Sequence, residues 1–224
     1  MGMGGPLDTA IPMTDSALLS LTQWLSPAFP VGGFAYSHGL EQAIAAGAVG
    51  DAGALEAWLT DVLLRGSGRA DAILLCAALD DAADWAALDG LARALAPSRE
   101  RLAETVEQGQ AFTEATNALT GTAHPPAALP VAVGRAARTL ALAPAQVVAL
   151  YLQSFAANLV AGAVRFIPLG QSAGQGVLQS LHPLILQVAA EAAVTPVDDI
   201  TSGVPGADLA AMAHETMDVR VFKT

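Results

Sequence analysis

The chain has 224 residues and a formal net charge of −11, with 10 lysines and arginines against 21 aspartates and glutamates. Such a surface repels nucleic acid and anionic membranes, so neither is expected as a partner, while a basic protein or a passing cation would be attracted. Hydrophobic residues make up 53% of the chain and aromatic residues only 5%, so the apolar content is mainly alanine, leucine and valine. Alanine and leucine favour helices. The composition predicts an all-α fold, long enough for one sizeable core and divided into short helices by its prolines and glycines.

A single cysteine, Cys76, excludes an internal disulfide and a paired-cysteine metal site. Its apolar neighbours predict a buried, inert thiol. The N-terminus lacks a basic segment followed by a compact apolar one, so no signal peptide is expected and the predicted location is cytoplasmic. The most apolar segment, residues 144–167, contains glutamine, asparagine and arginine, and is therefore interpreted as a core helix rather than a membrane span.

At the start of the chain, residues 1–13 are rich in glycine and proline and are predicted to form a flexible tail. Thr14 or Asp15 can cap a first helix, which closes before Pro27.

The next stretch, residues 26–41, reads Ser-Pro-Ala-Phe-Pro-Val-Gly-Gly-Phe-Ala-Tyr-Ser-His-Gly-Leu-Glu. Pro30 stops a helix, and Gly32 and Gly33 allow a positive φ or a close backbone approach. Ser37 can cap the short helix that follows. A loop so rich in glycine and aromatic residues suggests a role beyond connection, although an ordered turn packed on the core is an equally simple interpretation.

Amphipathic spacing then predicts four helices, over residues 51–65, 69–79, 85–95 and 98–119. Gly109 lies inside the last of them, where glycine costs about 1 kcal/mol relative to alanine, and so indicates a close approach to a neighbouring helix. The clearest loop follows at residues 121–130.

Residues 145–165 form the predicted central helix, because it is apolar around most of its circumference and must be surrounded. Within its semi-polar stripe, Asn158 is expected to satisfy a buried hydrogen bond and Arg165 to reach the surface. Further helices are expected over residues 175–193, kinked or broken by Pro183, and over residues 205–217. The predicted architecture is a single compact bundle of roughly ten short helices around a buried central helix.

Three separated segments resemble the motifs of the urease accessory protein UreF family. The first is Pro30-Val31-Gly32-Gly33-Phe34 with Ser37 and Gly39-Leu40-Glu41; the second is Pro168-Leu169-Gly170-Gln171; the third is His214-Glu215 with Arg220-Val221-Phe222-Lys223-Thr224. The resemblance places residues 14–224 in one UreF-like helical domain with a partner-binding C-terminal tail. It assigns a structural role to the motif residues Pro30, Gly32, Gly33, Phe34, Gly39, Pro168, Gly170 and Gln171.

The resemblance implies a non-catalytic chaperone in urease maturation. It implies a homodimer that joins the accessory protein UreD, also called UreH, which bridges it to apo-urease. It also implies that the chain engages the GTPase UreG and couples GTP hydrolysis to nickel delivery. No cofactor is expected here, because nickel is handled by the complex.

The chemistry in the sequence agrees with a scaffold. There is no phosphate-binding loop, dinucleotide motif or metal-binding motif, and the four histidines are isolated from one another, so no catalytic and no metal-binding residues are predicted. The predicted partner-binding residues are Tyr36, Glu41, Arg165, Arg220, Phe222 and Lys223. Arg165 or Arg220 could act as an arginine finger, and for Arg165 a structural salt bridge is at least as good an explanation. The alternative function is a small helical enzyme or ligand-binding protein that uses the loop around Tyr36 and His38.

Overall fold

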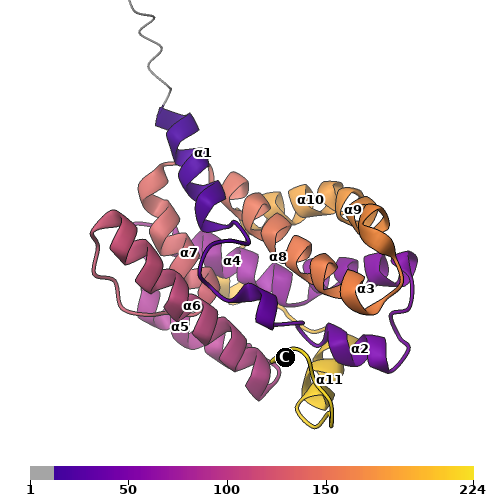
Figure 1. Cartoon of the computed structure of the whole chain (residues 1–224). Helices are drawn as coiled ribbons and strands as arrows, with labels where there is room; N and C mark the ends of the chain where they lie inside the picture. The colour runs from indigo at the N-terminus through magenta and orange to yellow at the C-terminus, as the bar shows by residue number, and fades with distance from the viewer. Residues whose placement is uncertain (1–12) are drawn as a thin grey trace, which may run out of the picture.

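Alanine- and leucine-rich segments fold into helices throughout residues 13–224, the part of the chain that this computed structural model describes, and none of these residues lies in a strand (Figure 1). The α-helices are α1 Met13–Trp24, α2 Leu40–Ala45, α3 Ala52–Arg65, α4 Ser67–Ala78, α5 Trp85–Ala94, α6 Arg99–Thr120, α7 Leu129–Ala137, α8 Pro144–Phe166, α9 Gly170–Ser180, α10 His182–Ala192 and α11 Pro205–His214. Short 3-10 turns occur at Gly33–Ala35, Arg138–Leu140 and Val197–Asp199. The predicted all-α class is confirmed.

The flexible tail predicted for residues 1–13 lies outside the described residues, apart from Met13, where α1 begins. Residues 14 and 15, suggested as caps of the first helix, lie inside α1 and do not precede it. The helices that the sequence predicted to begin at residues 51 and 98 start after side-chain caps. The Asp51 side chain accepts a hydrogen bond from Ala54 N at 2.8 Å, and Ser98 Oγ accepts one from Arg101 N at 3.1 Å. Each cap satisfies one backbone N–H that the first turn leaves free.

Helix α8 lies at the centre of the molecule and packs against α4, α9 and α10 (Figure 1). Val148, Leu152 and Ala156 on this helix are completely buried. By length and composition α8 could cross a membrane, a property that the core helix of a globular protein shares. Its packing confirms the buried central helix that the sequence predicted.

Gly109 brings α6 against the segment that leads into α7. A Cβ atom at Gly109 would lie 2.0 Å from Ala127 O and 2.6 Å from Leu129 N, so only glycine fits. The predicted close approach is therefore present, but the neighbour is the backbone of residues 127–129, most of which precedes the first residue of α7.

Two predicted helix boundaries were wrong. The break expected at Pro183 is confirmed, because Pro183 falls in the first turn of α10, where its missing N–H costs nothing, but the first of the two helices begins at Gly170 and not at residue 175. The helix expected over residues 205–217 ends at His214, after which Met217 N bonds His214 O at 3.1 Å and the chain turns back. This turn directs residues 218–224 toward the first motif.

Candidate functional site

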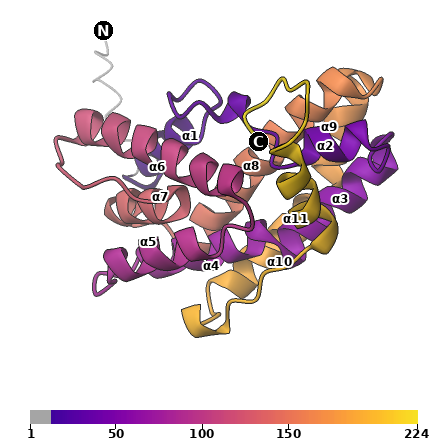
Figure 2. The same ribbon diagram turned by 90° about the horizontal axis from the view of Figure 1, so that it is seen from below.

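Residues 218–224, called the tail here, lie between α6 and α2, and the end of the chain is marked C in both ribbon views (Figures 1 and 2). Lys223 N donates to Ala35 O at 2.7 Å, and Ser37 N donates to Thr224 O at 2.7 Å. The first and third motifs, about as far apart in sequence as the chain allows, are therefore joined through their backbones. The tail, His214 at the end of α11, residues 35–41 and the facing side of α6 are together called the tail seam.

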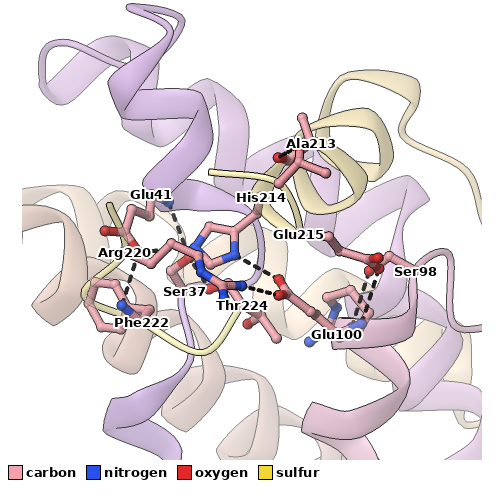
Figure 3. Close-up of polar contacts among 12 residues, drawn as sticks. Ser37, Glu41, Ser98, Glu100, Ala213, His214, Glu215, Arg220, Phe222 and Thr224 are labelled. Atoms are coloured by element: carbon pink, nitrogen blue, oxygen red, sulfur yellow. Dashed lines mark hydrogen bonds and ion pairs between the residues drawn. The ribbon is translucent and has the colours of Figure 1, made fainter. Parts of the chain in front are cut away.

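His214 occupies the middle of a charged cluster in this seam (Figure 3). Its imidazole is fully buried, with Nδ1 2.7 Å from Glu100 Oε2 and Nε2 3.0 Å from Glu41 Oε2. The other oxygen of Glu100 accepts a hydrogen bond from Arg220 Nη1 at 2.5 Å. One ring thus connects α11, α2 and α6, and Glu100 connects it to the tail.

Glu41 holds the tail backbone. Its carboxylate accepts hydrogen bonds from Val221 N at 2.9 Å and from Phe222 N at 3.0 Å, besides the contact with His214. Burial alone would raise the pKa of Glu41, but these hydrogen bonds outweigh it and hold that pKa below its usual range. Glu41 is therefore an ionised, internal anchor, and its side chain is only 6% exposed.

A second buried cluster lies around Glu104 on α6. Its carboxylate forms an ion pair with Arg101, accepts a hydrogen bond from Thr224 Oγ1 at 2.9 Å and lies 3.5 Å from His38 Nδ1. Burial would raise the pKa of Glu104, but Arg101 and His38 lower it to about 2. The carboxylate is thus ionised at neutral pH and joins the tail to the first motif.

His38 adopts an unusual backbone conformation in this cluster, with a φ of 59°. Such a left-handed conformation is uncommon for a residue other than glycine and persists where the surroundings enforce it. His38 Nε2 lies 2.5 Å from Ser67 Oγ at the start of α4, and burial lowers the pKa of the imidazole. The ring is therefore engaged inside the fold.

Tyr36 and Lys223 meet on Glu107 at the outer edge of the seam. Tyr36 Oη donates to Glu107 Oε2 at 2.5 Å, and Lys223 Nζ donates to the same oxygen at 2.8 Å. Burial and the neighbouring Glu107 raise the pKa of the Tyr36 hydroxyl. The Tyr36 side chain is buried, whereas Lys223 and Glu107 are exposed.

The C-terminal part of α8 meets the first motif at the surface. Arg165, at the end of α8, lies over the Phe34 ring at 5.8 Å, and both side chains are exposed. About two turns earlier in α8, Asn158 Nδ2 donates a hydrogen bond to Gly33 O at 2.7 Å. Arg165 reaches the surface as expected, and Asn158 is hydrogen-bonded, although its bond is only partly buried. Arg165 and Phe34 form a surface patch of an aromatic ring under a cation.

Arg165 differs from the other cations of the chain. Within residues 13–224, which contain all ten lysines and arginines, ion pairs with carboxylates engage Arg65, Arg93, Arg99, Arg101, Arg138, Arg220 and Lys223. Of the three others, Arg69 and Arg135 are partly or fully buried. Arg165 is thus the exposed cation of the described chain that has no carboxylate partner.

A comparison with known protein families identifies the family of this chain. The UreF family model matches residues 49–182. A urease accessory protein UreF from Cereibacter sphaeroides strain ATCC 17025 is 60% identical over 208 residues, which cover 93% of this chain and 99% of the relative.

The chain belongs to the UreF family of urease accessory proteins. Two further relatives are also urease accessory proteins UreF. The one from Dinoroseobacter shibae is 54% identical over 210 residues, covering 93% of this chain and 99% of the relative. The one from Paracoccus denitrificans is 53% identical over 210 residues, covering 94% and 97%.

In this UreF-family chain the motif residues chosen from the sequence take two kinds of position. Gly39 has a φ of 79°, and a Cβ there would lie 2.8 Å from Ala211 N, so it permits α2 and α11 to touch. Exposed positions are held by Pro30, Gly32, Phe34, Pro168, Gly170 and Gln171. The motifs thus include both internal contacts and surface.

Of the predicted partner-binding residues, Arg165, Arg220 and Lys223 are exposed, whereas Tyr36, Glu41 and Phe222 are buried. The Phe222 ring packs against Phe166 with a centroid distance of 5.4 Å. These three buried residues position the tail, so any effect of theirs on a partner would be indirect.

Sequence reasoning did not assign roles to His214, Glu100 and Glu104. A signal was present, since Glu100, Glu104 and Glu107 recur at helical spacing and mark one face of α6. That spacing indicates a shared face but not which distant histidine or tail residue will meet it.

No group of three or more histidine, cysteine, aspartate or glutamate side chains that could hold a metal ion occurs within residues 13–224. Cys76 in α4 is partly buried, and burial raises the pKa of its thiol to about 11. That shift is consistent with the inert thiol expected from the sequence.

A cavity of about 90 Å³ lies behind the first motif, lined by residues that include Trp24, Phe34, Asp71, Arg101 and Tyr151. Neither Tyr36 nor His38, the residues of the alternative ligand-binding interpretation, belongs to its lining. Both of these side chains are instead committed to hydrogen bonds within the fold.

Proposed function

We propose that this UreF-family chain acts in urease maturation as a scaffold without catalytic groups of its own. It binds UreD (UreH), which bridges it to apo-urease, and it receives the GTPase UreG so that GTP hydrolysis is coupled to nickel delivery. It works as a homodimer in the cytoplasm and regulates the GTPase. The observation that carries this proposal is the exposed patch formed by Arg165 on Phe34, beside the ordered tail.

The composition of this patch suits a protein partner. Phe34 is 45% exposed, and the guanidinium above it is not neutralised by a carboxylate of this chain. Arginine and aromatic residues are enriched in the energetically important centres of interfaces, and arginine binds carboxylates or phosphates through a planar fork. On a chain with a net charge of −11, an exposed cation without a carboxylate partner also fixes the orientation of an incoming partner.

The tail extends this patch. Lys223 lies over the Tyr36 ring at 5.5 Å, and Tyr36 is two residues from Phe34 in the first motif. Arg220 and Lys223 are exposed while they pair with Glu100 and Glu107. The Lys223–Glu107 pair is exposed on both sides and contributes little to stability, so Lys223 can exchange partners when a charged protein surface arrives.

Nickel is a cargo of the complex in this proposal and not a resident cofactor. His38 and His214 are buried against carboxylates and held by three or more segments of the fold. Using either ring as a ligand would break contacts that hold the tail, which disfavours a tight nickel site at these histidines.

The test is a matched pair of charge reversals. Arg165→Glu removes the cation from the patch, and Arg65→Glu makes the same charge change at an exposed arginine of α3 that is paired with Asp61. We expect Arg165→Glu to weaken binding of purified UreG to the complex with UreD by about tenfold or more and to reduce urease activation. Arg65→Glu should bind as the unmodified chain does, and both variants should keep the same helicity and oligomeric state. Equal binding by the two variants would remove the patch from the proposed interface.

A further inference from the structure

His214 is the one buried ring in the tail seam whose two nitrogens both face carboxylate oxygens (Figure 3). Glu100 Oε2 is 2.7 Å from Nδ1, and Glu41 Oε2 is 3.0 Å from Nε2. An ionised carboxylate only accepts hydrogen bonds, so each contact requires a proton on the imidazole nitrogen. The geometry therefore calls for an imidazolium, protonated at both positions.

The neighbours of the ring support this protonation state. Glu41 also accepts the backbone N–H groups of Val221 and Phe222, and Glu100 also accepts from the Arg220 guanidinium. Two carboxylates are then balanced by two cations, and His214 is one of them. A neutral ring, fully buried, would turn a lone pair toward a carboxylate oxygen with no water to intervene.

The same two carboxylates are the anchors of the tail. Glu41, from α2, holds the backbone at Val221 and Phe222, and Glu100, from α6, holds the side chain of Arg220. His214 is the group that joins these anchors. The hydrogen bonds of this ring therefore affect how residues 220–222 of the tail are held.

We propose that His214 is a positioning residue that locks the tail between α2 and α6 by donating a hydrogen bond from each ring nitrogen, one to Glu41 and one to Glu100, and that loss of either bond releases the tail. The inference rests on the proposed function, since the tail is part of the partner-binding surface. A locked tail presents Arg220 and Lys223 in the arrangement described above, and a released tail does not.

The charged groups around the ring come from every segment packed on it. They are Glu41 on α2, Glu100 on α6 and Arg220 on the tail. On the side of α11 itself, the adjacent Glu215 is occupied by Arg99, with Nη2 and Oε2 2.8 Å apart. Without the ring, Arg220 is the one cation left in this set for two carboxylates.

His38 provides an internal contrast in the same seam. One of its nitrogens faces the Glu104 carboxylate at 3.5 Å, but the other faces the Ser67 hydroxyl, which can donate as well as accept. A neutral ring satisfies these two neighbours. The two buried histidines are thus expected to differ in protonation at the same pH.

The test is nitrogen-15 NMR of the imidazole rings in the complete chain, without any partner, combined with amide hydrogen exchange of the His214→Gln variant. We expect both ring nitrogens of His214 to carry hydrogen-bonded protons, and only one ring nitrogen of His38. In His214→Gln the protection factors of the Val221 and Phe222 amides should fall by about tenfold or more, while those of α8 stay constant. A His214 ring with one protonated nitrogen, or tail amides that stay protected in a folded His214→Gln chain, would overturn the proposal.

A variant pair extends the test to binding. His214→Gln cannot span both carboxylates and should bind UreG more weakly, whereas His182→Gln, at an exposed position of α10, should lose neither tail protection nor binding. If His214→Gln fails to fold, the ring-nitrogen spectrum of the unmodified chain still decides. Because that spectrum uses no partner, it can fail while the Arg165 comparison succeeds, and the reverse, so the two proposals are judged separately.

Discussion

Around α8 the buried side chains are mainly leucine, valine and alanine, whereas in the tail seam they include glutamate, histidine and arginine. Most of the buried polar and charged residues of residues 13–224 gather there, namely Ser37, His38, Glu41, Arg101, Glu104, Gln108, His214 and Thr224. Burying apolar surface stabilises a fold directly, whereas a buried ion pair roughly balances its own desolvation. The comparison suggests that the region around α8 supplies the stability and that the tail seam specifies the shape of one surface.

The largest effect is expected where one partner of a buried ion pair is removed. Glu104→Gln leaves Arg101 buried without its carboxylate and should lower the free energy of unfolding by about 4 kcal/mol at pH 7. The pKa of Glu104 in the folded chain is about 2, below its ordinary value of 4.5, so its contribution is present above pH 4.5 and lost as the pH falls toward 2. Denaturant unfolding across this range should therefore show the two proteins converging in acid.

A double variant sharpens this prediction. Arg101→Met with Glu104→Gln removes both charges, and much of the lost stability should return if the pair contributes little net energy. A double variant as unstable as the single one would mean that the seam itself contributes stability, against the comparison drawn here.

The next effect concerns packing outside the seam. Gly109→Ala places a methyl group 2.0 Å from Ala127 O and should cost about 3 kcal/mol, because backbone must move to accept it. The same change at Gly90 in α5, where nothing lies within 4 Å, should stabilise the protein by up to about 1 kcal/mol. Thermal and denaturant midpoints measure both, and the same sign for the two variants would refute the close approach at Gly109.

A smaller effect of opposite sign is expected at Asp71, a carboxyl group of the cavity behind the first motif. Burial raises its pKa from 3.8 to about 6, so the folded state holds its proton more tightly than the unfolded state, and stability falls as the pH rises from 3.8 to 6. Asp71→Asn should remove this cost and raise the free energy of unfolding at pH 7 by roughly 2 kcal/mol.

The control for Asp71 is Asp51→Asn, because asparagine caps a helix about as well as aspartate does. Asp51→Asn should leave the free energy of unfolding nearly unchanged both below pH 3.8 and at pH 7. A loss of stability in Asp71→Asn at pH 7 would show that the ionised carboxylate makes a contact that outweighs its burial.

The two regions also differ in how far the sequence predicted them. The central helix and the starts of α3 and α6 follow from apolar spacing and from the caps Asp51 and Ser98, which are local features. The seam depends on pairs such as Glu41 with His214, which are 173 residues apart, and no local pattern specifies such a pair. The motifs marked the segments that meet in the folded chain, but they did not predict that Glu41 and Phe222 are buried while Arg165 is exposed.

The central claim, that the surface around Phe34, Arg165 and the tail receives UreG, is tested most directly by hydrogen exchange of the complex. The chain bound to UreD is compared with and without UreG, and amide protection is followed along the sequence. The account predicts added protection in residues 33–36, around residue 165 and in residues 218–224, with little change in the interior of α8. Added protection confined to other surfaces, with the tail unchanged, would contradict it.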